Sequence, residues 1–326
     1  MKIFLVAVHF HSSFGWSIEQ ALKRCGHEVI VFDYRKDTRL RAPLLSTLFV
    51  QRMNRLLSAL VKEVKPDLTF VAKGELLFPE TAKRIREVTG APLINWFPDA
   101  RPMAFDNVAH ALSCYDYFFT KNPYWNKKLR EIGYQNIHFL AHSYDPEIQK
   151  RMPLTEQERQ TFGSEVSFIG TMYPYRLKAL ERVQGMDFKI WGPGWEKLPC
   201  DHPLHGSCQR SGIIRGIDHS RVINASLINL NLHHYDDIDG LNQRFFDIAG
   251  CGGFQLVDDR AEIGRYLTPG KEVVCYRDVE ELCEKIRYYL ERPDEREAIR
   301  ENGFRRIRKG NTYDDRIKEI FSVIRT

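Results

Sequence analysis

The chain has 326 residues, 43% of them hydrophobic and 28% charged, which excludes a disordered, collagen-like or coiled-coil architecture. At roughly 150 residues per domain, this length predicts two domains. The net charge of +5 suits an anionic ligand but is too small to demand nucleic acid.

The sequence predicts a cytoplasmic protein without a membrane span. Its first apolar run, Ile3 to Phe10, is interrupted by His9 and is far shorter than the roughly 20 apolar residues a span needs. It also lacks the layout of a secretory signal. Seven scattered cysteines, an odd number, indicate reduced thiols.

The first half of the chain alternates strands and helices. Short apolar runs predict strands at 2–8, 28–32, 68–71, 92–96, 117–120 and 137–140. Helical periodicity predicts helices at 16–25, 44–64, 79–88 and 123–132. This alternation is typical of a parallel sheet with helices on both faces.

A polar segment, 143–163, then predicts a domain junction. Strands are expected afterwards at 165–169, 188–191, 227–232, 253–257 and 272–276. Helices are expected at 175–183, 219–225, 243–249, 279–291, 294–309 and 313–324, with Asp294 as an N-cap. The fold class is therefore α/β, with two doubly wound Rossmann-like domains facing across a cleft. Their predicted limits are 1–150 and 160–310.

Ligands of open parallel sheets bind beyond the carboxyl ends of the strands, so the loops there carry the candidate catalytic residues. His9 follows the first strand, where it can serve as a general base, unless it is simply packed or solvated. Asp99 follows the fourth strand and can orient or deprotonate a hydroxyl, or form an ordinary ion pair with Arg101.

In the second half, Gly170 to Arg176 link a strand to a helix, whose N-terminus favours phosphate. Arg176 can add a charge-assisted hydrogen bond or be a surface arginine. A second loop enters a helix that carries Arg244 and Asp247 on one face. These two can contact a diphosphate and a ribose, or form an intrahelical ion pair.

These motifs resemble the CgeB-like, spore-protein-type branch of the GT-B glycosyltransferases. The resemblance runs from about residue 165 to the end, and Trp96 to Asp99 is the best match in the first half. The segments that carry it are 170–176, 191–195, 226–233, 244–253, 267–270, 282–290, Gly303 and 311–316.

The resemblance implies a metal-independent glycosyltransferase that needs no cofactor and takes a nucleotide-diphosphate sugar, UDP-linked or another, as donor. The first domain would bind the acceptor, the second the donor, and the helix in 311–326 would cross back to the first domain. Asp239 and Asp247 stand where many retaining relatives have a Glu-x7-Glu pair that meets the donor sugar and the ribose. The implied donor-binding residues are Gly170, Arg176, Asn242, Arg244, Asp247 and Gly252.

Three questions stay open at this point. The acceptor can be a glycan, a protein, a small molecule or, as a minor alternative, a modified DNA base, and the reaction can retain or invert the anomeric configuration. The alternative functions are a nucleotide-sugar 2-epimerase and a non-enzymatic spore-coat or assembly protein. Cys200, His202, His205 and Cys208 lie close enough in sequence to be weighed as zinc ligands, although their spacing is unfamiliar.

Overall fold

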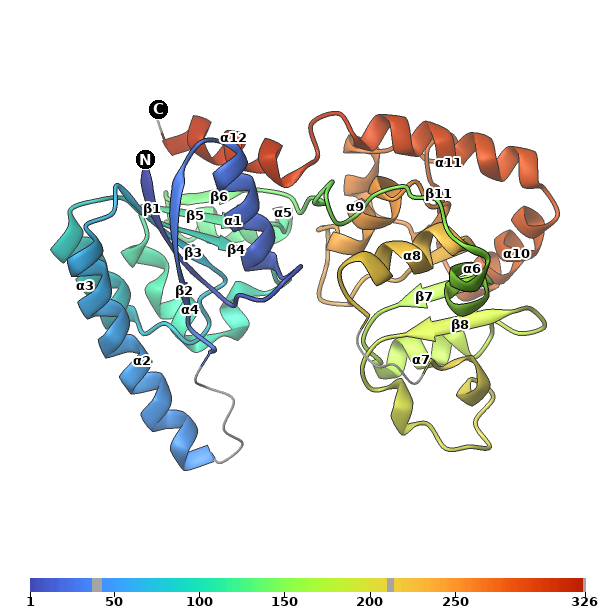
Figure 1. Ribbon diagram of the computed structural model, residues 1–326, viewed down its shortest axis with the longest axis horizontal. Coiled ribbons are helices and arrows are strands. Elements are labelled where there is room, and N and C mark those ends of the chain that lie inside the picture. The colour runs from blue at the N-terminus through green and yellow to red at the C-terminus, as the bar shows by residue number, and fades with distance from the viewer. Residues whose placement is uncertain (37–42, 210–213, 325–326) are drawn as a thin grey trace. The chain divides into compact units, whose positions relative to one another are not determined.

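The computed structural model describes residues 1–36, 43–209 and 214–324, and it divides into two compact units (Figure 1). Unit 1 comprises Met1–His142, Tyr235–Gly240 and Tyr313–Thr326. Unit 2 comprises Ser143–His234 and Leu241–Thr312. Each unit contains one parallel sheet, so the predicted α/β class with two doubly wound sheets is confirmed.

The sheet of unit 1 has six parallel strands in the order β2-β1-β3-β4-β5-β6. Their bounds are β1 Lys2–Ala7, β2 Glu28–Asp33, β3 Leu68–Ala72, β4 Leu93–Phe97, β5 Tyr117–Thr120 and β6 Ile137–Phe139. From β1 the chain goes first to β2 on one side and then returns to β3 on the other side, and this reversal is typical of a doubly wound sheet.

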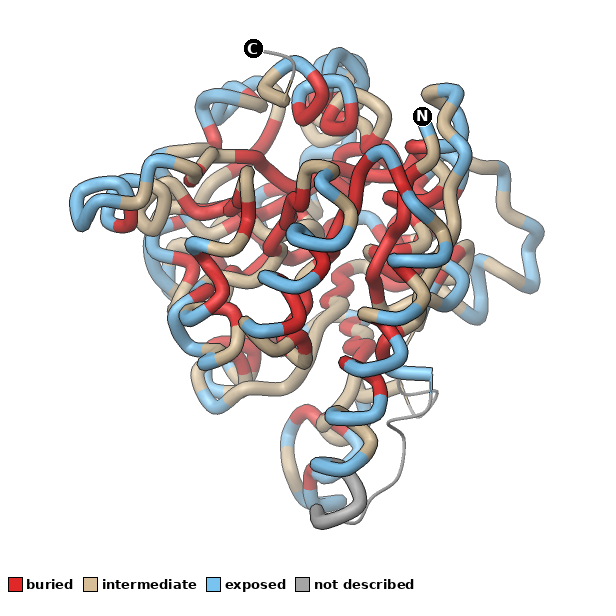
Figure 2. Tube along the Cα trace, turned by 90° about the vertical axis from the view of Figure 1, so that its left-hand side faces the viewer, coloured by how far each residue is buried: buried red, intermediate tan, exposed pale blue. Residues whose placement is uncertain are grey.

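Helices cover both faces of this sheet, and β1 shows why. Ile3, Leu5 and Ala7 point to one face, and Phe4 and Val6 to the other, so every position of the strand after Lys2 is apolar. One face packs against α1 (Phe14–Arg24) and α12 (Tyr313–Ile324). The other packs against α2 (Pro43–Val64), α3 (Pro79–Thr89), α4 (Asp106–Ala111) and α5 (Pro123–Glu131). Figure 2 shows the buried strands beneath helices with exposed outer faces.

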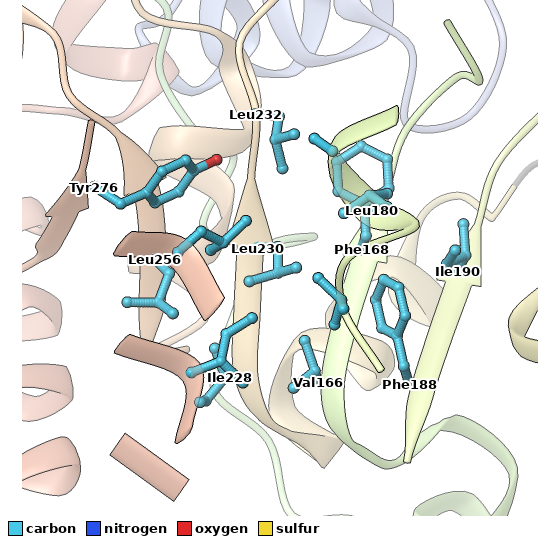
Figure 3. Packing of buried hydrophobic residues seen from close by; sticks show 14 of the residues in the cluster. Val166, Phe168, Leu180, Phe188, Ile190, Ile228, Leu230, Leu232, Leu256 and Tyr276 are labelled. Carbon is cyan, nitrogen blue, oxygen red and sulfur yellow. The ribbon is translucent and has the colours of Figure 1, made fainter. Parts of the chain in front are cut away.

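The sheet of unit 2 has five parallel strands in the order β11-β10-β9-β7-β8. Their bounds are β7 Ser164–Ile169, β8 Phe188–Trp191, β9 Ser226–Asn231, β10 Gln255–Asp258 and β11 Val274–Tyr276. The helices are α6 Glu156–Phe162, α7 Pro174–Leu180, α8 Ile217–Ala225, α9 Gln243–Gly250, α10 Val279–Leu290 and α11 Pro293–Ile307. Figure 3 shows the larger core, in which Phe168 and Leu230 of the sheet meet Leu180 of α7.

The structure differs from the sequence prediction at several helices. The prediction missed α4 and α6, both short and largely polar. Thr155 begins α6 with a capping box to Glu158, inside the segment expected to be an irregular junction. The predicted N-cap at Asp294 is wrong, because α11 begins at Pro293 and places Asp294 in its first turn.

The short segment Tyr235–Gly240 belongs to unit 1 although its neighbours in sequence belong to unit 2. Two ion pairs hold it there. The Lys121 ammonium meets the Asp237 carboxylate with both side chains buried, and Arg101 Nη2 lies 2.9 Å from Asp236 Oδ2. Unit 1 is therefore built from segments that are not continuous in sequence. Among the described residues, no helix is long and apolar enough to cross a membrane.

Candidate active site

In unit 2, two loops at the carboxyl edge of the sheet pack closely on each other. The indole Nε1 of Trp195 donates to the carbonyl of Gly170 at 2.7 Å, and the Met172 amide donates to Pro193 O at 3.0 Å. Gly170 has no room for a side chain, because a Cβ there would lie 2.5 Å from Nη2 of Arg244. The loop after β7 thus places the Arg244 guanidinium directly against the backbone.

Paired amides fix the N-terminus of α9 at the end of β9. Asn242 is the N-cap and accepts from the Phe245 amide at 2.9 Å through Oδ1. Its side chain also exchanges two hydrogen bonds with Asn231, the last residue of β9, at 2.8 and 3.2 Å. Arg244 Nη1 donates to Asn231 Oδ1 at 3.1 Å. The helix N-terminus and the guanidinium are therefore held together in a fixed geometry.

Arg244 is a partly buried cation that the described part of the chain does not neutralise. No carboxylate there lies within ion-pair distance of it, so the alternative of an intrahelical pair with Asp247 is wrong. Burial and the neighbouring guanidinium of Arg176 lower the pKa of Arg244. A bound anion would relieve both penalties, and the adjacent helix N-terminus attracts the same charge.

Arg176 braces the same edge of the sheet. Its Nη1 donates to Thr171 O at 3.0 Å and its Nη2 to Leu232 O at 2.9 Å, and the residue is 6% exposed. The ring of Phe168 lies under both arginines, 5.6 Å from Cζ of Arg176 and 5.1 Å from Cζ of Arg244. Arg176 therefore joins the loops after β7 and β9 and adds positive potential beside Arg244.

Sequence reasoning missed a second polar group at this edge, built on Asp258 at the end of β10. Its Oδ1 accepts from the His233 amide at 2.9 Å and lies 2.7 Å from the His233 Nδ1, while Arg260 binds its Oδ2 at 2.7 Å. Burial opposes ionisation of Asp258, but His233 and Arg260 outweigh it and lower its pKa to about 2. Because His233 is 25 residues away from Asp258, only the positions of these two residues at strand ends hint at their contact.

Two of the predicted donor-binding residues make no hydrogen bond or ion pair with the Arg244 guanidinium in the described part of the chain. Asp247 is 5% exposed on α9, and its Oδ1 has no hydrogen-bond partner among the described residues. Burial raises the pKa of Asp247 well above its usual value. Gly252 follows the C-terminal end of α9, opposite the Asn242 cap, and packs against the Arg151 side chain. The structure thus groups Gly170, Arg176, Asn242 and Arg244, but not Gly252.

In unit 1, His9 follows β1 and has a carboxylate partner that the sequence did not reveal. Its Nε2 lies 2.7 Å from Oε2 of Glu19, on the first helix. Lys23 also contacts Glu19, at 2.7 Å. Burial opposes ionisation of Glu19, but its bonds to Lys23 and His9 prevail and lower its pKa. A carboxylate that orients an imidazole is the arrangement that a general base needs.

Asp99 and Asp239, the other predicted catalytic residues, also belong to unit 1. Asp99 follows β4 and pairs with Lys73, whose Nζ lies 2.8 Å from Oδ2, rather than with the adjacent Arg101. Asp239 is half-buried and makes no hydrogen bond or ion pair with the described residues. Of the two, Asp239 has the freer carboxylate.

The four candidate zinc ligands do not converge. His202 Nε2 lies 3.2 Å from Glu181 Oε1, His205 Nδ1 lies 3.1 Å from Leu198 O, and the Cys208 thiol contacts Leu204 O. In the described ranges, no group of three or more His, Cys, Asp or Glu side chains is placed to hold a metal ion.

Two doubly wound parallel-sheet units in one chain are the architecture of the GT-B fold. Residues 175–322 match the family model described as glycosyl transferase-like. Spore protein CgeB of Bacillus subtilis (strain 168) is 22% identical over 280 residues, covering 78% of this chain and 82% of that protein.

Solved structures agree with this fold. Sucrose-phosphate synthase from Thermosynechococcus elongatus superposes with a TM-score of 0.73 at 11% identity, over 99% of this chain and 98% of that one. Anabaena HepE, in complex with UDP and glucose, gives a TM-score of 0.66 at 11% identity, over 99% of both chains. The predicted resemblance to CgeB-like GT-B glycosyltransferases is confirmed, and the chain is an enzyme of the glycosyltransferase class.

Proposed function

We propose that this enzyme moves a sugar from a nucleotide-diphosphate sugar, UDP-linked in the first instance, to a hydroxyl acceptor without a bound metal. The observation that carries the proposal is Arg244, a partly buried guanidinium without a carboxylate partner at the N-terminus of α9. The UDP in the HepE complex gives a reason to test UDP first.

The chemistry follows from the charge on the leaving group. As the bond between the anomeric carbon and the diphosphate oxygen breaks, that oxygen gains negative charge. Arg244 and the free N–H groups at the start of α9 would bind this charge. Arg176 would add positive potential while holding the two loops. These fixed cations and dipoles can do the work that a divalent metal does elsewhere.

His9 is the proposed base for the acceptor. It would take the proton from the attacking hydroxyl through whichever ring nitrogen faces the substrate, while Glu19 stabilises the imidazolium that forms. Asp99 is a weaker candidate, because Lys73 already neutralises it. If His9 is the base, the sugar is transferred with inversion; if Asp239 contacts the donor sugar as in retaining relatives, the configuration is retained. Asp247 would contact the ribose of the donor, which requires the ribose to reach its buried carboxyl.

The first experiment is calorimetric titration of UDP, GDP, TDP, ADP and CMP, with and without EDTA. We expect one diphosphate to bind regardless of EDTA, and Arg244→Ala to weaken it by about 10- to 100-fold, the loss of a hydrogen bond to a charged group. Arg306→Ala, an exposed arginine of α11 without an ion pair in the described residues, is the matched control and should bind normally. Failure of every nucleotide to bind would favour the non-enzymatic spore-coat or assembly function.

The base is tested by acceptor-dependent release of the nucleotide diphosphate. His9→Gln should lower kcat strongly and leave nucleotide affinity unchanged, and Glu19→Gln should lower kcat less. NMR of the product's anomeric centre then distinguishes inversion from retention. Turnover of the nucleotide sugar without any acceptor would instead support the 2-epimerase alternative, which no feature of the structure favours.

The acceptor is proposed to be a glycan, protein or small molecule, with a modified DNA base as a minor alternative, and the compartment to be the cytoplasm.

A further inference from the structure

A cationic groove is lined by residues that the proposed glycosyl transfer does not use. It lies between α2 and α3 on unit 1 and encloses about 650 Å³. Three of its lining residues are cations: Arg55 and Lys62 on α2 and Arg84 on α3. Glu80 is its acidic lining residue, so the groove is electropositive.

The groove is a built feature rather than a gap between loosely packed helices. Asn54, 3% exposed, fixes α2 against the start of α3, because its Nδ2 donates to Leu76 O at 2.9 Å and its Oδ1 accepts from the Phe78 amide at 2.9 Å. The helical spacing then sets Arg55 and Lys62 two turns apart along one wall, with Arg84 on the other.

The cations of the groove are uncommitted. Arg55, Lys62 and Arg84 are exposed and make no hydrogen bond or ion pair with any described residue. The same is true of Arg52 on the outer face of α2. Other surface cations of unit 1 behave differently: Arg86 pairs with Asp116 at 2.7 Å, and Lys128 pairs with Glu131 at 2.9 Å.

Aliphatic side chains are exposed beside these cations. Leu48 and Leu56 on α2 are 62% and 47% exposed, and Val88 at the end of α3 is 39% exposed. Water-exposed aliphatic groups among unpaired cations match the interface of an anionic bilayer, which offers phosphates to the cations and acyl chains to the leucines. A nucleic acid would use the cations but gain little from leucines, since its bases stack on aromatic rings.

We propose that this surface, the groove between α2 and α3 with the outer face of α2, docks unit 1 onto an anionic phospholipid membrane. Arg55, Lys62 and Arg84 contact lipid phosphates, while Leu48 and Leu56 enter the headgroup region. The attachment is peripheral, and it does not depend on the proposed donor chemistry of unit 2.

The test is co-sedimentation of the full chain with vesicles of phosphatidylcholine alone or with about one third phosphatidylglycerol. We expect binding only to the anionic vesicles, weakened by salt. The triple variant Arg55→Glu, Lys62→Glu, Arg84→Glu should bind at least about 100-fold less well, since each neutralised cation alone is worth about fivefold. Leu48→Ser with Leu56→Ser should also weaken binding, whereas a purely ionic contact would be indifferent to it.

The matched control places the same charge change on unit 2, at Lys197, Lys271 and Arg306, which are exposed and without ion pairs in the described part of the chain. It should still sediment with anionic vesicles. All variants should keep the wild-type thermal midpoint and UDP affinity, which separates loss of docking from misfolding. The proposal is overturned if the wild type binds no vesicles, or if it binds vesicles of phosphatidylcholine alone. It is also overturned if both triple variants lose binding equally, or if the protein binds glycerophosphate or duplex DNA more strongly than vesicles.

Discussion

Gly170→Ala tests whether the backbone of the β7 loop positions Arg244 for an anion. The added Cβ would lie 2.5 Å from Arg244 Nη2 and 2.9 Å from Phe168 Cζ. The guanidinium is the flexible end of a long side chain, so it will move before the backbone does. The Phe168 ring is fully buried and cannot easily move away from the new methyl group. Overpacking of this kind lowers the stability of the fold by about 1 to 3 kcal/mol.

Displacing the guanidinium should remove a charge-assisted hydrogen bond to the diphosphate, worth about 1.5 to 3 kcal/mol. We therefore expect the Kd for UDP to rise about 10- to 150-fold in calorimetry, while the protein stays folded by circular dichroism. Gly206→Ala is the matched control, because a Cβ there meets no atom within 4 Å.

A double-mutant cycle makes the test specific. In an Arg244→Ala background the new methyl group has no guanidinium to displace, so Gly170→Ala should change UDP affinity little. The reasoning is refuted if Gly170→Ala binds UDP as wild type does, or if it weakens binding equally in both backgrounds.

Two further predictions concern unit 1. Lys121→Met should destabilise the unit by about 3 to 5 kcal/mol in urea unfolding, because it removes the buried cation beside Asp237, and an effect below 1 kcal/mol would show that the pair is not needed. Burial, helped by the charges of Lys121 and Arg316, lowers the pKa of His142 to about 3 in the folded state. Because the unfolded chain then binds a proton that the folded state cannot, folding becomes less stable as the pH falls below the pKa of an unfolded histidine, about 6.5. Stability should drop by about 2 kcal/mol between about pH 7 and pH 5 through this residue, and His142→Gln should lose that part of the pH dependence; an unchanged slope would contradict the assignment.

The strands were predictable because most of them contain a short, mainly apolar run that can be recognised without knowing its partner strand. β1 is apolar from Ile3 to its end, and both of its faces are buried in the structure. The helices α4 and α6 escaped prediction because their sequences are polar or short, and tertiary contacts or a capping box, rather than periodicity, define them.

The grouping of Gly170, Asn242 and Arg244 could be anticipated from local sequence, since Gly170 follows a strand and the other two lie at the start of a helix. What the sequence could not reveal is pairing over long distance. Asn231 holds Asn242 from the neighbouring strand end. Asp258 binds His233 from 25 residues away. Such pairs follow from the register of the sheet, which single-strand patterns do not encode.

The partners of Asp99 and His9 are likewise set by contacts that the sequence does not show. Asp99 has an arginine two positions away in sequence, but its actual partner is Lys73, brought alongside by the pairing of β3 with β4. The Glu19 carboxylate that reaches His9 lies on the buried side of α1, where a glutamate is unexpected and the sequence gives no warning.

If Arg244 binds the nucleotide, it should lower the stability of the nucleotide-free protein while it raises nucleotide affinity. A partly buried guanidinium without a carboxylate destabilises the unliganded fold, so Arg244→Met should raise the stability of the nucleotide-free protein by about 1 kcal/mol. Loss of the hydrogen bond from Arg244 to Asn231 Oδ1 should cost little stability, because Asn242 still donates to the same oxygen. UDP should then no longer raise the thermal midpoint, although it does so for the wild type. If Arg244→Met instead lowers the stability of the nucleotide-free protein by more than about 1 kcal/mol, the guanidinium is a structural brace and the anion site must be sought elsewhere.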